Sequence, residues 1–238
     1  MKKVETAPVP EDGAAPPRRR PGRPRLEAPS ADYVARQEEI VSKAAEVFRE
    51  KGYDAGTLDD VAEALDFRRA SLYYYVRSKS HLLYLIFEQA LEHSLRQLEE
   101  YARIEDPALR LETLIRHRIH RIATEPNSFT VFFDQRSRLD SRYEDDIVSK
   151  ERRYLKVYRE AVNSAIAAGA MEDVDPLYAT QAIFGMTNWI YKWFKPERHN
   201  VEEFTDVCLK IILGAGAGRA PQPAPPPSGR RTRSSRGR

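Results

Sequence analysis

Few side chains of this 238-residue sequence occur at spacings that support catalysis or metal binding. His117 and His120 lie three residues apart, which places both on one face of a helix, and Asp106 and Glu112 precede them. Protein zinc sites use at least three protein ligands, and these histidines have no strong third ligand nearby in sequence. We therefore expect no metal site and interpret both histidines as surface or pocket residues.

Motifs of the common enzyme classes are also missing from the sequence. It contains no glycine-rich phosphate loop after a strand, no HExxH metal motif and no nucleophile elbow. The single cysteine, Cys208, rules out an internal disulfide or a cysteine-rich metal cage, and its apolar neighbours Val207 and Ile211 predict that it is buried. We expect a protein that is not an enzyme and carries no cofactor.

Basic residues concentrate at the two ends of the chain, although the net charge is only +3. Residues 1–30 contain seven Lys or Arg, and residues 214–238 contain six Arg and no acidic residue, which leaves residues 31–213 with a net negative charge. Twelve of the sixteen prolines lie in the same two end segments, so both are predicted to be disordered basic arms. Such arms indicate a polyanionic partner, most simply nucleic acid; the alternative for the C-terminal tail is that it only keeps the protein soluble.

The N-terminal arm contains a more specific pattern. Residues 18–25 read RRRPGRPR, whose Gly-Arg-Pro centre resembles an AT-hook. Gly22 permits a close backbone approach and Pro24 keeps the strand extended, so Arg23 and Arg25 are placed to lie along a narrow A·T minor groove. We interpret this segment as a minor-groove DNA arm; the alternative is a generic solvated basic tail.

Hydropathy argues against a membrane or secreted protein. The mean hydropathy is −0.62, and the two lysines near the start are not followed by an apolar segment. No run approaches the ~18 apolar residues of a membrane helix. We expect a cytoplasmic protein without a membrane partner, associated with the nucleoid when it is bound to DNA.

Residues 31–80 contain three segments in which apolar residues recur at helical spacing. The first ends at Gly52, which suits a helix C-terminus, and the second follows Thr57, which suits a helix N-cap. The third spans residues 69–75. Two short helices joined by a tight connection and braced by a longer helix before them describe a helix-turn-helix DNA-binding domain.

Between Glu39 and Leu83 the sequence reads AAxxF after Ile40, then KGY, TLDDVA, ASLYYYV and SKSHLL. This combination of spaced motifs resembles the DNA-binding domain of the TetR family of transcriptional regulators. Two residues depart from the family pattern: Asp66 stands where a small residue is usual, and Arg68 stands where Ser or Thr often caps the third helix. Arg68 offers no acceptor for a capping bond, so the cap is expected from Asp66 or from water.

The resemblance implies that residues 69–75 form the recognition helix, which enters the DNA major groove with Leu72 and Val76 turned to the core. Arginine suits bidentate reading of guanine, alanine or a tyrosine edge suits a thymine methyl, and tyrosine hydroxyls suit phosphates. Lys79 matches the family's lysine at the start of the fourth helix and is expected to anchor a phosphate, helped by Thr57 and Tyr53. Simple packing is the alternative for each tyrosine, most of all for Tyr73. The outward DNA-binding candidates are Arg69, Ala70, Ser71, Tyr73, Tyr74 and Tyr75.

Residues 81–213 show no strand-like alternation and are predicted to be helical throughout. Prolines mark helix starts, and Gly169 and Pro196 mark helix ends. The expected spans are 80–104, 107–125, 128–138, 143–169, 175–195 and 200–213. The predicted fold class is all-α: an N-terminal three-helix helix-turn-helix domain plus a C-terminal helical domain, which by the TetR resemblance binds an effector and dimerises.

The segment from Ala182 to Phe194 is apolar around most of its circumference, more than one core face requires. In the TetR family the last two helices of each subunit usually build a four-helix interface, so one side of this segment is expected to face a second copy. A homodimer binds a palindromic site in double-stranded DNA, with recognition helices about one DNA turn, ~34 Å, apart. The candidate interface residues are Phe184, Ile190, Trp193, Val207 and Ile211.

A second, narrower resemblance concerns the effector. The sequences VFFDQ at 131–135 and WIYKWFKP at 189–196 are similar to TetR-family members that control fatty-acid, sterol or aromatic degradation and respond to acyl-CoA thioesters. This implies a tunnel of aromatic side chains around the acyl chain and arginines that bind the CoA phosphates. The candidate arginines are Arg116, Arg118, Arg121, Arg136 and Arg138. The alternative is that the aromatics form core and the arginines a solvated face. The ligand-binding candidates are Arg116, His120, Phe129, Phe132, Phe133, Tyr154, Tyr158 and Asn188.

Two functions of different classes remain open. The first is a repressor that a small hydrophobic effector, such as an acyl-CoA, releases from a palindromic operator by shifting the conformational population. The second is a constitutive DNA-architectural or protein-interaction module without a ligand switch. A defined palindrome and a metabolite that dissociates the complex favour the first, and sequence-indifferent binding favours the second.

Overall fold

The computed structural model describes residues 30–214, and within that range the regular structure is entirely helical. The predictions for the N-terminal arm, with Arg23 and Arg25, and for the C-terminal tail lie outside the described residues. The all-α prediction is confirmed. The elements are α1 (Ala31–Lys51), α2 (Leu58–Ala64), α3 (Arg69–Tyr75), α4 (Lys79–Tyr101), α5 (Pro107–Thr124), α6 (Pro126–Gln135), the 3₁₀ helix η1 (Arg136–Arg138), α7 (Ser141–Ala167), α8 (Pro176–Asn188), α9 (Ile190–Trp193) and α10 (Val201–Leu213).

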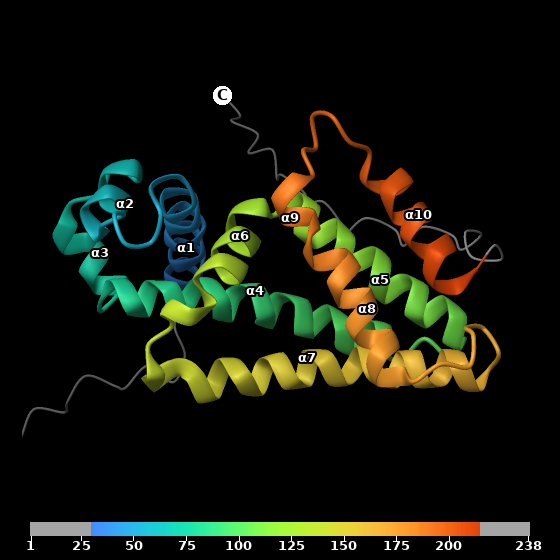
Figure 1. Cartoon of the computed structure of the whole chain (residues 1–238). Helices are drawn as coiled ribbons and strands as arrows, with labels where there is room; N and C mark the ends of the chain where they lie inside the picture. The colour runs from blue at the N-terminus through green and yellow to red at the C-terminus, as the bar shows by residue number, and fades with distance from the viewer. Residues whose placement is uncertain (1–29, 215–238) are drawn as a thin grey trace, which may run out of the picture.

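Local sequence signals define the ends of the first helices (Figure 1). Gly52, with a φ of +79°, ends α1 in the left-handed region that glycine tolerates. Thr57 and Asp60 form a reciprocal capping box at the start of α2: the Asp60 amide donates to the Thr57 hydroxyl over 3.1 Å, and the Thr57 amide donates to the Asp60 carboxylate over 2.7 Å. Leu72 and Val76 are fully buried, as their four-residue spacing predicts.

The start of α3 differs from the expectation. Arg68 occupies the N-cap position, and no side chain in the described part of the chain caps this helix. Asp66 adopts a φ of 53°, in the left-handed region, where a residue without a bulky side chain fits at lower cost. The expected cap from Asp66 is therefore wrong: this residue forms the turn between α2 and α3.

Two helices connect α1–α3 with the rest of the chain. The first half of α4, including Leu82 and Phe87, packs into the core of α1–α3, whereas Leu95 and Leu98 of the same helix pack with α5 and α7. α6 packs against both α1 and α4. Figure 1 shows α7 lying lengthwise beside α4, with α5, α8 and α10 grouped at one end of the molecule and α1–α3 at the other.

The predicted helix over 175–195 is interrupted. It begins at Pro176, capped by the Asp175 carboxylate, but α8 ends at Asn188 and α9 covers only Ile190–Trp193. The backbone tightens at Trp189, whose carbonyl accepts from the Lys192 amide three residues on, so the α-helical ladder is broken there. No helix among residues 30–214 combines the length and apolarity that crossing a bilayer requires.

Candidate functional site

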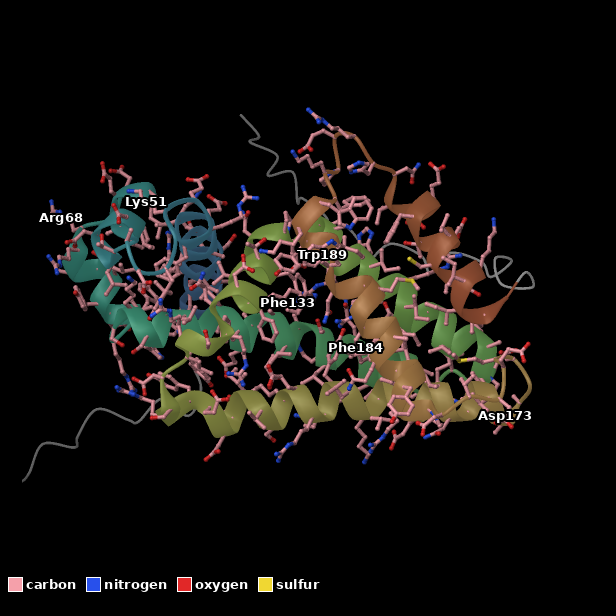
Figure 2. The ribbon with its side chains drawn as sticks, in the orientation of Figure 1. Lys51, Arg68, Phe133, Asp173, Phe184 and Trp189 are labelled. Carbon is pink, nitrogen blue, oxygen red and sulfur yellow. The ribbon has the colours of Figure 1, made fainter. Side chains whose placement is uncertain are left out.

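The outer face of α3 presents polar and aromatic side chains to solvent. Arg69, Ala70 and Ser71 are exposed, and so are Tyr73 and Tyr74, at 44% and 72% of their surface. The exposed residues of α3 are the ones predicted to face the DNA, with one exception at the end of the helix. Figure 2 shows Arg68, the residue before α3, at the far edge of the molecule.

The exception is Tyr75. Its ring lies 4.9 Å from the ring of Tyr33 on α1 and packs against the core of α1–α4. The expectation that Tyr73 is the tyrosine most prone to packing is wrong, because α3 turns Tyr73 outward. Tyr75 therefore braces α3 against α1, while Tyr73 and Tyr74 remain available at the surface.

Arg69 is held by weak contacts on the exposed face of α3. A terminal nitrogen lies 3.0 Å from an Asp59 carboxylate oxygen, and the guanidinium carbon lies 5.7 Å from the centre of the Tyr73 ring. Ion pairs between exposed side chains contribute only about 0–1 kcal/mol. The guanidinium can therefore exchange these partners for a guanine or a phosphate at little cost.

Lys79, Tyr53 and Thr57 flank α3 near the start of α4. The Lys79 ammonium donates to the Asp54 carbonyl over 3.0 Å and sits 4.5 Å from the centre of the Tyr53 ring. Partial burial and the neighbouring Asp54 charge raise the pKa of Tyr53, which keeps its hydroxyl protonated as a donor. Thr57 is exposed and already caps α2. These three residues are thus near the protein surface in positions from which a DNA backbone is reachable.

A cavity of about 270 Å³ lies among α4, α5, α6, α7 and α8. Five aromatic side chains from three of these helices form much of its wall. Figure 2 shows Phe133 on α6 and Phe184 on α8 in the middle of the molecule, and Trp189 at the end of α8. The lining residues are Ala90, Leu91, Ser94, Arg118, Phe129, Phe132, Phe133, Glu151, Tyr154, Leu155, Gln181, Phe184 and Asn188.

The structure brings together five of the eight ligand-binding candidates and excludes three. Phe129, Phe132, Phe133, Tyr154 and Asn188 line the cavity.

Arg116 does not line it, because its guanidinium pairs with Glu112 at 2.9 Å and with Asp206 on α10 at 2.8 Å. His120 points to solvent. Tyr158 lies behind the wall, fully buried, and donates to the Leu114 carbonyl over 2.8 Å.

Two of the five predicted dimer-interface residues lie inside the chain instead of on its surface. Phe184 lines the cavity, with its ring 5.0 Å from that of Tyr158, and Ile190 is fully buried in the chain's own core. The apolar circumference of this segment thus serves the cavity and the core in addition to any outer surface. Trp193, Val207 and Ile211 are exposed, at 38%, 48% and 66%.

Arg118 is the polar centre of the cavity. It is 5% exposed, and its Nε and Nη1 donate over 2.8 Å to the Thr187 and Tyr154 hydroxyls, while Nη2 donates to the Asn188 side chain. The predicted arginine of the ligand site was Arg116 instead, which does not line the cavity. A signal was present: Arg118 interrupts the apolar stripe of Leu111, Leu114 and Ile115 at helical spacing, whereas Arg116 falls off that stripe.

Further ionisable groups are buried beside Arg118 on α5. Burial and the nearby charges of Arg121 and two other histidines lower the pKa of His117 to about 3, so this imidazole is neutral. Burial also lowers the pKa of Arg121, whose Nε and Nη1 have no hydrogen-bond partner in the described residues. Cys208 is buried, as predicted, and desolvation raises its pKa to about 11, so it is an inert packing residue.

A helix-turn-helix unit joined to a helical domain with a cavity is the architecture of a one-component transcriptional regulator. Two sequence profiles of one family match the chain. "Bacterial regulatory proteins, tetR family" matches residues 40–84, and "Tetracyclin repressor-like, C-terminal domain" matches residues 105–215. The chain belongs to the TetR family of transcriptional regulators, which confirms the expectation that it is not an enzyme.

Individual relatives agree with this assignment. The transcriptional repressor KstR2 of Mycolicibacterium smegmatis is 25% identical over 196 residues, which is 76% of this chain and 90% of KstR2. The biofilm operon icaADBC negative regulator IcaR of Staphylococcus aureus is 41% identical over 56 residues, and the chain spans only 28% of its length.

Solved structures match over more of their length. AibR in complex with isovaleryl coenzyme A and operator DNA has a TM-score of 0.69 and 26% identity, over 75% of this chain and 98% of AibR. PfmR from Thermus thermophilus has a TM-score of 0.69 and 26% identity, over 73% of this chain and 96% of PfmR.

Proposed function

We propose that the chain is a sequence-specific DNA-binding repressor that a small hydrophobic effector releases from a palindromic operator. One observation carries the proposal: the same helix, α6, borders the cavity and packs against the helix-turn-helix unit. The chain acts in the cytoplasm, and at the nucleoid when bound, with double-stranded DNA and a second copy of itself as partners.

At the DNA, α3 is the reading element. Arg69 contacts a guanine edge, Ala70 and Ser71 lie close to bases, and the hydroxyls of Tyr73 and Tyr74 contact phosphates or thymine methyls. Lys79, Tyr53 and Thr57 contact the backbone at the edge of the groove. Tyr75 acts through packing, by fixing the angle at which α3 leaves α1.

Release follows from the position of α6. Phe132 lines the cavity, and its ring also lies 5.0 Å from that of Phe87 in the core of α1–α4, where Val131 is buried. Directly after α6, Arg138 pairs with Asp54 over 2.7 Å at the edge of the helix-turn-helix unit. A ligand that fits a displaced α6 better than the present one shifts the population toward dimers whose α3 helices no longer match the operator.

Dimerisation is proposed for the outer surface of α8, α9 and α10. Trp193, Val207 and Ile211 are exposed there, and so are Tyr178 and Trp189, at 73% and 61%. Large exposed apolar side chains that cluster on one surface mark protein–protein contacts. A two-fold axis through this surface yields the paired α3 helices that an inverted repeat requires.

For the effector, acyl-CoA thioesters are the first class to test. The support is the aromatic wall of the cavity and the likeness to AibR, whose structure contains isovaleryl coenzyme A and operator DNA. A cavity of about 270 Å³ suits the acyl part of such a molecule. The CoA phosphates then lie outside the cavity, since Arg116 is occupied by acidic partners on α5 and α10.

The test is selection of fragments of the source genome by the purified full chain, followed by sequencing without a chosen target. Enrichment of one inverted repeat, lost in Arg69→Ala, supports the regulator. Enrichment that does not depend on sequence overturns it and favours the constitutive architectural module. Neighbouring genes of lipid or aromatic degradation strengthen the acyl-CoA assignment, and other neighbours redirect the ligand search.

A further inference from the structure

The wall of the cavity contains a buried positive charge without a counter-ion. Arg118 is 5% exposed, and no carboxylate of the described residues lies within ion-pair distance of it. Its three partners, Thr187, Tyr154 and Asn188, are all neutral. A buried charge of this kind is costly unless a partner of opposite charge arrives.

The guanidinium also retains unused donors. An arginine carries five N–H groups, and three of those of Arg118 are engaged, one on each nitrogen. One hydrogen on each terminal nitrogen is left without an acceptor among residues 30–214. Each of these hydrogens can donate a charge-assisted hydrogen bond to a carboxylate oxygen.

The neighbouring charges do not neutralise Arg118. Glu151 also lines the cavity, but Arg136 engages both of its oxygens, at 2.9 Å and 3.1 Å. Arg121, one turn along α5, does not line the cavity, and its Nη2 donates to the Glu125 carboxylate over 2.8 Å. The α5 side of the cavity therefore carries the positive charge of Arg118, and the side formed by α6 and α8 is aromatic.

We propose that the cavity binds a hydrophobic carboxylic acid in its ionised form, with the carboxylate on Arg118 and the apolar body against Phe129, Phe133 and Phe184. This inference rests on the proposed function, because it names the chemical class of the effector. It separates a free acid from a CoA thioester, whose carbonyl is neutral and leaves the charge of Arg118 unpaired. Arg118 is the specificity-determining residue.

The test is calorimetric binding to the full chain without DNA, using two matched pairs of probes: octanoate with 1-octanol, and 3-phenylpropionate with 3-phenylpropan-1-ol. Octanoyl-CoA is the third arm. A hydrogen-bonded carboxylate on a buried arginine is worth about 10- to 100-fold in affinity, so in at least one pair the acid is expected to bind that much more tightly than the alcohol. The acid is also expected to bind more tightly than octanoyl-CoA.

Variants on α5 test whether Arg118 causes the preference for the acids over the alcohols. Arg118→Met is expected to reduce the acid-to-alcohol ratio to near one, and Arg118→Lys to retain part of it. Arg116→Met is the matched control: its guanidinium lies outside the cavity lining and pairs with Glu112 and Asp206, so the ratio is expected to stay unchanged. Circular dichroism and thermal melting verify the fold of each variant. If Arg118→Met does not fold, the acid-to-alcohol ratios of the wild type and Arg118→Lys test the inference.

Several results would overturn the inference. These are equal affinity for acid and alcohol in the wild type, a preference that survives Arg118→Met in the folded protein, tighter binding of octanoyl-CoA than of octanoate, or no binding of any probe. Binding is measured without DNA, so these results leave operator recognition untouched. The genomic selection described above tests the regulator separately. If the protein selects an operator but does not prefer the acids over the alcohols, the proposed function stands and this inference is refuted.

Discussion

Arginines at the two ends of the molecule occupy opposite environments. On α3, Arg69 is exposed and holds its partners loosely, so its charge is available to an incoming polyanion. On α5, Arg118 is buried at 5% exposure, and its charge is available only to a molecule that enters the cavity. The same residue type thus serves surface recognition in one region and internal recognition in the other, and solvent access decides which.

The largest expected effect is a loss of folding stability in the core of the helix-turn-helix unit. Leu72→Ala removes a fully buried side chain under α3 and is expected to lower the free energy of unfolding by about 2–5 kcal/mol. Urea unfolding measures this loss. Leu72 does not line the cavity, although Leu91 and Phe132 belong both to its core cluster and to the cavity wall, so operator binding should fall more than the affinity for octanoate. An equal loss of both affinities would contradict this expectation; Leu177→Ala, at an exposed position, is the control.

Acid is expected to weaken the C-terminal region through His117. Its pKa is about 3 in the folded chain and 6.5 ordinarily, so the unfolded state binds the proton first as pH falls. The stability that the neutral imidazole contributes is complete above pH 6.5 and decreases towards pH 3. Between pH 6.5 and about 4.5 the loss is about 2–3 kcal/mol.

Urea unfolding at these two pH values measures the loss. His117→Leu should flatten the pH dependence, whereas His120→Leu, at an exposed position on the same helix, should leave it as in the wild type. Equal slopes for the wild type and His117→Leu would refute the assignment.

At the DNA surface, Arg69→Ala is expected to weaken operator binding by about 1–3 kcal/mol, because a bidentate contact to guanine contributes that much. Anisotropy titration with the selected operator and with variants at one base pair measures both affinity and discrimination. Relaxed discrimination at one position supports base reading; a uniform loss over all sequences would instead make Arg69 a phosphate contact. The affinity for octanoate should not change.

A smaller effect is expected at the cap of α2. Thr57→Ala removes the side chain that accepts from the Asp60 amide and should cost about 1 kcal/mol of stability. Thr57→Ser keeps the hydroxyl and serves as the control. If Thr57 also contacts DNA, Thr57→Ala lowers operator affinity by more than the loss of folded protein explains; an affinity that follows stability alone would restrict Thr57 to capping.

The smallest expected effect comes from the N-terminal arm. Deletion of residues 1–30, with Arg23 and Arg25, should weaken DNA binding and reduce the slope of log affinity against log salt by roughly 0.9 for each lost phosphate contact. Titrations between low and moderate salt measure the slope. An unchanged slope would exclude the arm from DNA binding.

The helix-turn-helix region was predictable because its signals are local. Gly52, Thr57 and the spacing of Leu72 and Val76 each fix a helix end or a face within a few residues. The exceptions were Tyr75, which packs across to α1, and the turn at Asp66, whose backbone conformation the sequence does not specify.

The cavity was less predictable because helices far apart in sequence form it. Aromatic residues of α6 were expected there from the resemblance to acyl-CoA-responsive family members, but Ser94, Leu155 and Gln181 carry no local sign of facing a cavity. Phe184 and Ile190 were assigned to the dimer because an apolar helix face does not reveal whether it meets a cavity, a core or a partner. Arg118 carried a readable signal, a charge within an apolar stripe, but Arg116 was chosen as the candidate instead.

The central claim is that a ligand in the cavity controls α3. The most direct measurement is the affinity of the full chain for its selected operator, titrated with octanoate and with octanoyl-CoA while ligand occupancy is followed in parallel. A coupled switch predicts that saturation with the ligand that binds weakens operator affinity by about 5- to 150-fold. Saturation with that ligand at unchanged operator affinity would contradict the account.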